Sequence, residues 1–176
     1  MKSLKQNIEL KVKISSIVDF RNILINNKSR FVRRMKQVDT YFTYPSGRLK
    51  IRNINNQKGE IIFYKRADKK NSRISDYWVV PISKSEILKF VSVFKELFGI
   101  IVVVKKNREL WMYKHTRIHL DKVKDLGFYL ELETVVKGIS LEKAKLEHRQ
   151  VIKKLGLKPL ESIAKSYSDI LLRKNH

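Results

Sequence analysis

The sequence predicts an α+β fold in which an eight-stranded antiparallel β-barrel has helices packed on its outside. Apolar and polar residues alternate with period two through most of the chain, as they do in half-buried strands. The polar faces of successive strands carry full charges rather than neutral polar groups. About eight antiparallel strands can close into a barrel whose interior is lined by every second residue. If the charged faces point inward, the lumen holds many cations and several carboxylates, and helices cover the apolar outer faces.

The strands are expected where this alternation is strongest. In residues 7–14 every even position is apolar and every odd position is polar, including Glu9 and Lys11. After the turn signal Pro45-Ser46-Gly47, residues 48–52 place basic side chains on one face, and residues 61–66 return as the second strand of a hairpin. On this second strand we place Lys65 on the face of Ile61 and Phe63. Further strands are expected at residues 31–44, 76–80, 100–106, 108–114, 117–123 and 128–136.

Four helices complete the predicted elements, at residues 16–27, 83–98, 140–155 and 160–173. Ser83 and Ser140 are N-cap candidates, and Ser83 with Glu86 forms a capping-box pattern. There are no repeats and no long linker, so we expect a single domain over residues 1–176.

The composition excludes several classes of protein. The chain has no cysteine, which rules out disulfides, zinc–thiolate sites and thiol nucleophiles. The longest apolar run, residues 98–104, is far shorter than the roughly 20 residues of a membrane helix. Residues 1–16 carry charges but no apolar h-region, so we expect no secretory signal. We therefore expect a cytoplasmic protein without membrane association.

A formal net charge of +22 favours a polyanionic partner, because such a field attracts phosphates. A generic nucleic-acid binder is one hypothesis, and it predicts a steep dependence of affinity on salt. It does not explain why the cations alternate with apolar residues on opposite strand faces. No GxxxxGK motif is present to bind phosphate in a P-loop.

Eight short motifs follow one another along the chain. They are Asn7-Ile8-Glu9-Leu10-Lys11, Gln37-Val38-Asp39-Thr40-Tyr41-Phe42, Gly47-Arg48-Leu49-Lys50-Ile51-Arg52, Tyr64-Lys65-Arg66, Lys106-Asn107-Arg108, Arg117-Ile118-His119-Leu120-Asp121, Leu130-Glu131-Leu132-Glu133 and Ser166-Tyr167-Ser168-Asp169-Ile170-Leu171. Each motif alone is weak, but eight in this order are specific. The chain resembles the CYTH superfamily of triphosphate tunnel enzymes, and within it the class IV adenylyl cyclase-like branch.

This resemblance implies a tunnel that binds a triphosphate chain and uses Mg²⁺ or Mn²⁺ as its cofactor. Basic residues of the motifs would bind the substrate phosphates: Lys11, Arg48, Lys50, Arg52, Lys65, Lys106, Arg108 and Arg117. Acidic residues of the motifs would bind the metal: Glu9, Asp121, Glu131 and Glu133. The resemblance makes Glu9, Lys11, Lys65 and Arg117 the candidate catalytic residues. Lys13 and Arg66 are additional basic neighbours.

These residue types suit the chemistry independently of the resemblance. Arg can bind phosphate oxygens through two parallel hydrogen bonds, and Lys acts as a point charge. Mg²⁺ commonly takes one or two carboxylates together with substrate phosphates, and Glu131 and Glu133 project to the same side of a strand. His115 and His119 would stand about 13 Å apart on a strand, too far to share a metal, so we assign them structural or supporting roles.

One departure from the family pattern bears on the metal. Asn7 stands where the family opens with Glu, which removes one charge from the carboxylate cluster but keeps a carbonyl oxygen. A smaller departure is Asn53, where the branch often has an acidic residue.

Two classes of function follow from these residues. The first is a metal-dependent enzyme acting on ATP, thiamine triphosphate or tripolyphosphate, either by releasing orthophosphate or by cyclising ATP to cyclic AMP. The second is a binding module of low activity for polyphosphate or for the 5′-triphosphate end of RNA. The sequence does not choose between hydrolysis and cyclisation, and it leaves a homodimer open.

Overall fold

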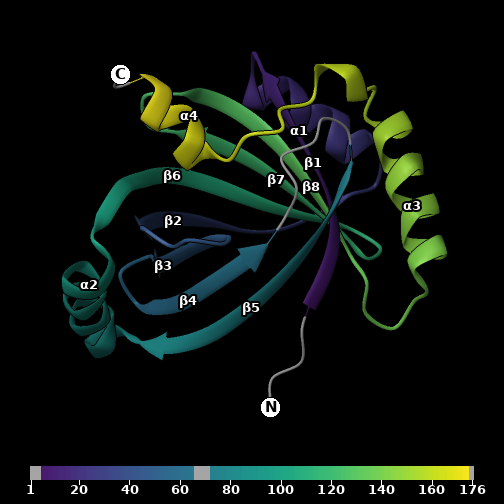
Figure 1. The fold of residues 1–176 in the computed structure, drawn as a ribbon. Coiled ribbons are helices and arrows are strands. Elements are labelled where there is room, and N and C mark those ends of the chain that lie inside the picture. The colour runs from purple at the N-terminus through teal and green to yellow at the C-terminus, as the bar shows by residue number, and fades with distance from the viewer. Residues whose placement is uncertain (1–4, 66–71, 175–176) are drawn as a thin grey trace.

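A computed structural model describes residues 5–65 and 72–174 and contains the expected closed barrel. The elements along the chain are β1 (Lys5–Ile14), α1 (Ile17–Asn26), β2 (Arg30–Phe42), β3 (Arg48–Ile54), β4 (Lys58–Lys65), β5 (Arg73–Ser83), α2 (Lys84–Phe98), β6 (Ile100–Tyr113), β7 (Thr116–Val123), β8 (Gly127–Val135), α3 (Leu141–Lys154), the 3₁₀ turn η1 (Pro159–Glu161) and α4 (Tyr167–Lys174). The strand order around the barrel is β1-β5-β4-β3-β2-β6-β7-β8, and every ladder is antiparallel. The predicted fold class is therefore confirmed (Figure 1).

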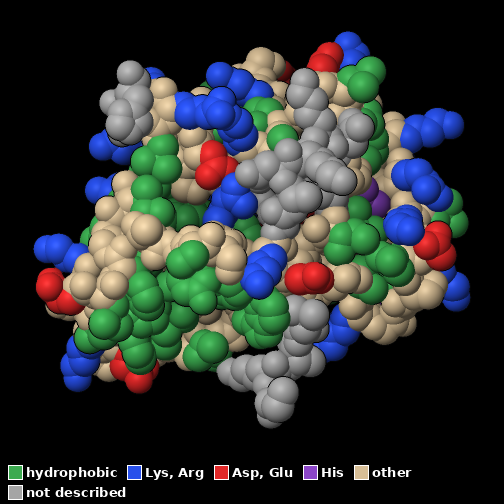
Figure 2. Space-filling view, in the orientation of Figure 1, with side chains coloured by type: hydrophobic (Ala, Val, Ile, Leu, Met, Phe, Trp, Pro, Cys, Tyr) green, Lys and Arg blue, Asp and Glu red, His purple; other side chains and the backbone are tan. Residues whose placement is uncertain are grey.

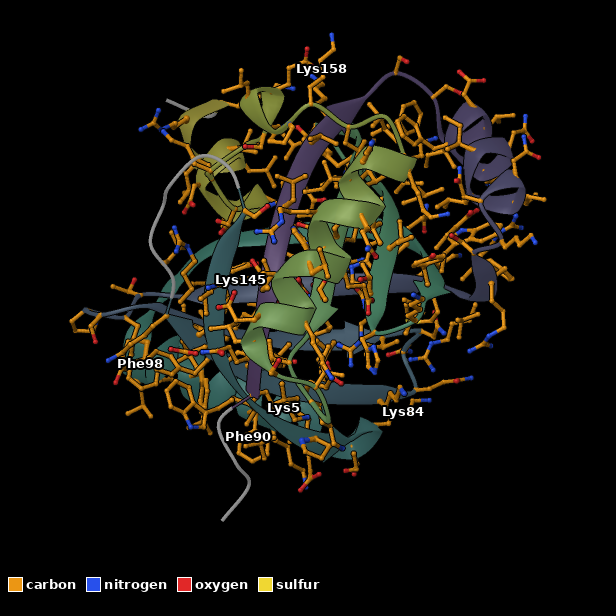
Figure 3. All side chains as sticks on the ribbon, turned by 90° about the vertical axis from the view of Figure 1, so that its right-hand side faces the viewer. Lys5, Lys84, Phe90, Phe98, Lys145 and Lys158 are labelled. Atoms are coloured by element: carbon orange, nitrogen blue, oxygen red, sulfur yellow. The ribbon has the colours of Figure 1, made fainter. Side chains whose placement is uncertain are left out.

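Helices pack on the apolar outer faces of the strands. One core cluster joins even-numbered residues of β1, β7 and β8, such as Leu10 and Leu130, to Val151 and Ile152 of α3. Figure 3 shows α3 crossing in front of these strands. A second cluster joins Ile51 and its neighbours on β2, β3 and β5 to the inner face of α2. The barrel thus has its main apolar cores outside the strand cylinder, as the alternation predicts.

Helix α4 closes one end of the barrel. Tyr167 and Leu171 of α4 pack against buried side chains that point inward from the strands, among them Tyr41, Val104 and Tyr129. In Figure 1, α4 lies across this end, above β6. The lumen therefore has an apolar plug at one end.

Two predicted elements differ in the structure. The strands expected at 100–106 and 108–114 form one continuous strand, β6, because Asn107 keeps its place in the ladders opposite Lys36 and Lys122. The helix expected at 160–173 is wrong over its first half. Strand β5 pairs with β1 only as far as Glu9. Beyond that point the Lys11 carbonyl accepts a hydrogen bond from the Ile163 N–H at 2.8 Å, so the segment around Ile163 runs beside β1 instead of forming a helix.

The outward side of α2 keeps large apolar side chains in contact with solvent. Leu88 is 78% exposed and Leu97 is 66% exposed. Hydrophobic side chains gather over this part of the surface in Figure 2, at the lower left. No helix in the described part of the chain is both long enough and apolar enough to cross a membrane.

Candidate active site in the barrel

A polar cavity of about 260 Å³ lies inside the barrel. The period-two geometry of the strands brings the odd residues of β1, β5, β7 and β8 and the even residues of β3, β4 and β6 to the lumen. Its basic lining residues are Lys5, Lys11, Lys50, Arg52, Lys106, Arg108 and Arg117. Its acidic lining residues are Glu9, Glu60, Glu131 and Glu133. Most of the residues predicted to bind substrate therefore do meet in one cavity.

Asp39 holds three of these cations from behind the cavity wall. Its carboxylate is completely buried and accepts two hydrogen bonds from Arg52, from Nε at 2.7 Å and from Nη2 at 2.9 Å. Oδ2 also accepts hydrogen bonds from Lys50 Nζ at 3.0 Å and Lys106 Nζ at 3.1 Å. Burial alone would raise the pKa of Asp39, but the charges of Arg52, Lys106 and Lys50 hold it well below its ordinary value. Asp39 is therefore an anion that fixes the positions of three phosphate-binding candidates.

Lys106 is the cation in this group that burial affects most. Its side chain is 2% exposed. Burial, opposed by Asp39 and reinforced by the charge of Arg108, lowers the pKa of Lys106 to about 7. In the absence of an anionic ligand, this amine is therefore partly neutral near neutral pH.

Asp121 holds Arg108 in the same way that Asp39 holds Arg52, through two hydrogen bonds. The Arg108 Nε donates to Asp121 Oδ1 at 2.7 Å and its Nη2 donates to Oδ2 at 2.6 Å, and Tyr167 OH adds a hydrogen bond to Oδ2 at 2.9 Å. Burial would lower the pKa of Arg108, but Asp121 and Glu131 raise it, so the guanidinium stays charged. Asp121 was predicted to bind metal; the structure places it behind Arg108 instead, outside the cavity lining.

Tyr167 connects α4 to both sides of the site. Its ring lies 3.9 Å from Lys11 Nζ, and its hydroxyl binds Asp121. Burial, together with the charge of Asp121, raises the pKa of Tyr167 well above its ordinary value, so the phenol keeps its proton. Helix α4 therefore orients Lys11 directly and orients Arg108 through Asp121.

Glu131, Glu133 and His119 form a group with the properties of a metal site. One potential ligand atom from each residue lies within 4.8 Å of the others. His119 and Glu131 are directly opposite in the ladder between β7 and β8. The His119 Nδ1 is buried and has no hydrogen-bond partner in the part of the chain that the structure describes. Carboxylate and imidazole donors are usual metal ligands. The residues present therefore fit a divalent cation.

The carboxylates of this group are also held by cations. Glu131 accepts from Lys11 Nζ at 3.0 Å and from Arg108 Nη2 at 2.5 Å. Burial would raise the pKa of Glu131, but Lys11 and Arg108 hold it well below its ordinary value. Glu133 lies farther from its nearest cation, with 3.8 Å between its Oε2 and Arg117 Nη1. Glu9, predicted to bind metal, lines the same cavity and is paired with Glu133 across the ladder between β1 and β8.

Two of the predicted phosphate-binding residues lie elsewhere. Lys65 is exposed on the outer face of β4 with Ile61 and Phe63, because the alternation turns Tyr64 inward. Arg48 lies beyond the cavity lining, where its Nη2 donates to Asp169 of α4 at 2.8 Å. Of the additional basic neighbours, Lys13 is exposed and Arg66 lies outside the described residues.

The remaining wall of the cavity is nearly free of charge. It consists of inward-facing residues of β4 and β5: Ile62, Tyr64, Ser75, Tyr77 and Val79. Glu60 is the charged residue that β4 contributes to the lining. One side of the cavity is therefore charged and can bind an anion, whereas the side formed by β4 and β5 is mainly aromatic and apolar.

The sequence interpretation missed Asp39 and Tyr167 as parts of the site and gave His119 only a supporting role. Asp39 and Tyr167 both stand inside motifs quoted above, and Asp39 alternates with Tyr41 on the inner face of β2. The alternation was thus a usable signal for Asp39. The convergence of Lys50, Arg52 and Lys106 on one carboxylate depends on strand register, which the local sequence does not specify.

Comparisons with known proteins agree with this architecture. A protein of Pyrococcus horikoshii OT3 superposes with a TM-score of 0.80 at 27% identity, covering 93% of this chain and 98% of its own. A conserved hypothetical protein of Pyrococcus furiosus gives a TM-score of 0.78 at 30% identity, with the same coverage of 93% and 98%. A candidate adenylate cyclase of Vibrio parahaemolyticus has the same fold, with a TM-score of 0.77 at 16% identity and coverage of 96% and 99%.

None of the curated proteins matches the chain significantly. The model of the CYTH domain, in contrast, matches residues 5–167, which include all eight strands and the start of α4. The resemblance read from the eight motifs is therefore confirmed, and the chain belongs to the CYTH domain family.

Proposed function

We propose that the protein is a divalent-cation-dependent enzyme that hydrolyses an organic triphosphate inside the barrel. One observation carries the proposal: cations from four different strands converge on a single cavity that Glu131 and Glu133 also line, and ligand atoms of these two carboxylates lie within 4.8 Å of one of His119. A triphosphate chain brings about four negative charges, and phosphoryl transfer is catalysed mostly by positioning and charge neutralisation. The cavity supplies both on rigid strands.

The cations would bind the phosphate oxygens in fixed positions. Arg52 and Arg108 are each held by a buried aspartate through two hydrogen bonds, so they lose little conformational freedom when an anion arrives. Lys11 and Arg117 flank the acidic group and would neutralise charge on the phosphate that is transferred. Lys50 and Lys106 would bind the remaining oxygens.

Glu131 and Glu133, with Glu9 beside them, would hold Mg²⁺ or Mn²⁺. A divalent cation there would supply charge neutralisation and polarisation of the phosphate oxygens. In the hydrolysis that we propose, a water oxygen forms a bond to the terminal phosphorus. The bond from that phosphorus to the bridging oxygen breaks, and orthophosphate leaves. Glu9 is our candidate to accept the proton of the attacking water, because it is an acidic residue of the lining next to Glu133.

The uncharged wall of β4 and β5 favours a substrate with an organic group over inorganic tripolyphosphate. Tyr77 and Tyr64 offer ring surfaces, and Ile62 and Val79 offer apolar contact. Any base or other flat ring can stack on aromatic side chains, because stacking does not depend on hydrogen bonds to a particular base. ATP and thiamine triphosphate are therefore our preferred substrates.

Hydrolysis has support from a Hippeastrum protein of the same fold, described by its dominant triphosphatase activity, at a TM-score of 0.66 and 13% identity. Cyclisation of ATP by attack of the ribose 3′-hydroxyl on the α-phosphorus is the second candidate reaction. Its support is the shared fold of the Vibrio neighbour, which is described as a candidate adenylate cyclase. A binding module of low activity is favoured by one observation only, the neutral Asn7 in the cavity lining.

A substrate panel tests these proposals together. ATP, GTP, thiamine triphosphate, tripolyphosphate and triphosphorylated RNA would each be incubated with the protein, and both orthophosphate and cyclic nucleotide would be measured. We expect orthophosphate from the organic triphosphates, loss of turnover with EDTA, and recovery with Mg²⁺ or Mn²⁺. Turnover that EDTA leaves unchanged would contradict the metal-dependent enzyme. Binding of every triphosphate without turnover would favour the binding module.

A further inference from the structure

The imidazole of His119 has an unusual environment for a histidine with a purely structural role. His119 lies on the inner face of β7 between Arg117 and Asp121, and its side chain is 6% exposed. Among the described residues, its buried Nδ1 has no hydrogen-bond partner. Most buried polar atoms in native proteins are hydrogen-bonded, so an exception calls for an explanation such as a bound ion.

The position of this nitrogen suits a cation shared with the two glutamates. Nδ1 lies 3.6 Å from Glu133 Oε1, and ligand atoms of His119, Glu131 and Glu133 lie within 4.8 Å of one another. Two ligands that each stand about 2.1 Å from an octahedral cation are about 3 Å apart when adjacent and about 4.2 Å apart when opposite. The separations of the three atoms are therefore near those that one shared ion requires.

We propose that His119 binds the divalent cation together with Glu131 and Glu133, and that this nitrogen ligand makes the site prefer Mn²⁺ and Co²⁺ to Mg²⁺. The proposal rests on the proposed function for the location of the metal. Mg²⁺ prefers oxygen ligands, whereas imidazole nitrogen suits first-row transition ions. A carboxylate-only site in the same cavity would lack this source of selectivity.

The direct test is the Mn²⁺ spectrum of the full chain, free of any histidine tag and without triphosphate. Electron spin echo envelope modulation detects a nitrogen bound to Mn²⁺, and labelling the histidines with ¹⁵N identifies that nitrogen as imidazole. We expect histidine nitrogen coupling in the wild-type protein. This measurement needs no variant, so it decides the proposal even if a substituted protein does not fold. Absence of nitrogen coupling would overturn the proposal.

His119→Gln provides the second measurement, with His115→Gln as its matched control. His115 is 45% exposed and contacts Glu147 outside the barrel. We expect His119→Gln to lose the nitrogen coupling and to weaken Mn²⁺ binding by about 10- to 100-fold while Mg²⁺ binding changes little. His115→Gln should keep the wild-type spectrum and both affinities. An equal loss of Mn²⁺ and Mg²⁺ affinity in His119→Gln would indicate a structural role and overturn the selectivity.

These results are separable from the fate of the proposed function. Turnover that requires a divalent cation, combined with a Mn²⁺ spectrum without nitrogen coupling, would refute the role of His119 and leave the enzyme. Nitrogen-coupled Mn²⁺ in a protein that turns over no triphosphate would support the ligand and refute the enzyme.

Discussion

Asp39 and Arg52 form an ion pair joined by two hydrogen bonds, and the aspartate lies completely buried behind the cavity. The same carboxylate also accepts from Lys50 and Lys106. Asp39 therefore offsets part of the repulsion among Arg52, Lys50 and Lys106, while burial and the positive charges of Arg108, Arg52 and Lys50 still lower the pKa of Lys106. A triphosphate must share these cations with a carboxylate that stays in place.

The first prediction concerns this carboxylate. Asp39→Asn keeps the side-chain shape but leaves three buried or half-buried cations without their anion, and breaking a buried ion pair commonly costs about 3–5 kcal/mol. We expect a loss of that order in the free energy of unfolding, measured by urea denaturation. Tripolyphosphate should stabilise the variant more than the wild-type protein, because its charge replaces the missing one.

Glu142→Gln is the control for this experiment. Glu142 forms an exposed ion pair with Lys145 on α3 and is 77% exposed. Its replacement should leave the free energy of unfolding essentially unchanged. Equal effects of the two substitutions would contradict the role given to Asp39.

The second prediction follows from the pKa of Lys106, which is lowered to about 7. The unfolded chain holds this proton up to about pH 10.4. Between the two values the unfolded state binds a proton that the folded state lacks, so this group adds stability as the pH rises from about 7 towards 10. A bound phosphate favours the charged amine, so binding of tripolyphosphate at pH 8 should take up close to about one proton.

Calorimetry in two buffers with different ionisation enthalpies measures this uptake. Lys106→Met removes the titrating amine and keeps the length of the apolar stem. We expect the uptake to fall by most of a proton in this variant. The same uptake in both proteins would show that another group titrates.

The third prediction concerns Asn7, which is 3% exposed and whose Oδ1 has no hydrogen-bond partner. Asn7→Glu adds a carboxylate one inward position from Glu9, so we expect tighter binding of Mg²⁺ and a higher kcat. Without a divalent cation the variant should be less stable, because the added charge is buried without a partner. Melting temperatures with EDTA and with Mg²⁺, together with kcat, check this. An unchanged affinity for Mg²⁺ would place Asn7 outside the metal site.

Much of the barrel could be predicted because most strands carry polar residues on one face and apolar residues on the other. Over residues 7–14 of β1 every inward residue is polar and every outward residue apolar, so the inner set needs no knowledge of neighbouring strands. On β4 both faces carry apolar residues, with Ile62 and Tyr64 inside and Ile61 and Phe63 outside. The pattern there gives no contrast in polarity, yet its alternation places Lys65 on the face of Ile61 and Phe63, as observed. The resemblance alone placed Lys65 in the site, and the structure has it outside the cavity lining.

The fourth prediction tests that correction. Lys50→Met removes a cation from the cavity lining and should lower kcat/KM by about 100-fold or more, the effect of losing about 3 kcal/mol of charge stabilisation. Lys65→Met removes an exposed cation outside the barrel and should leave kcat/KM nearly unchanged. Steady-state kinetics with ATP and thiamine triphosphate compare the two. A comparable loss in Lys65→Met would return Lys65 to the site.

The last prediction separates recognition of the organic group from recognition of the phosphates. Tyr77 lies on the uncharged wall, and the loss of stacking on an aromatic ring costs about 1–3 kcal/mol. Tyr77→Ala should therefore raise KM for ATP or thiamine triphosphate by about fivefold or more, and Tyr77→Phe, which keeps the ring, should not. Both variants lose the hydrogen bond between the Tyr77 hydroxyl and Arg117. Any effect on the binding of tripolyphosphate should therefore be the same in Tyr77→Ala and Tyr77→Phe, because that ligand has nothing to stack. If Tyr77→Ala weakens tripolyphosphate to the same extent, the ring acts by positioning the cations, and the β4 and β5 wall does not select the substrate.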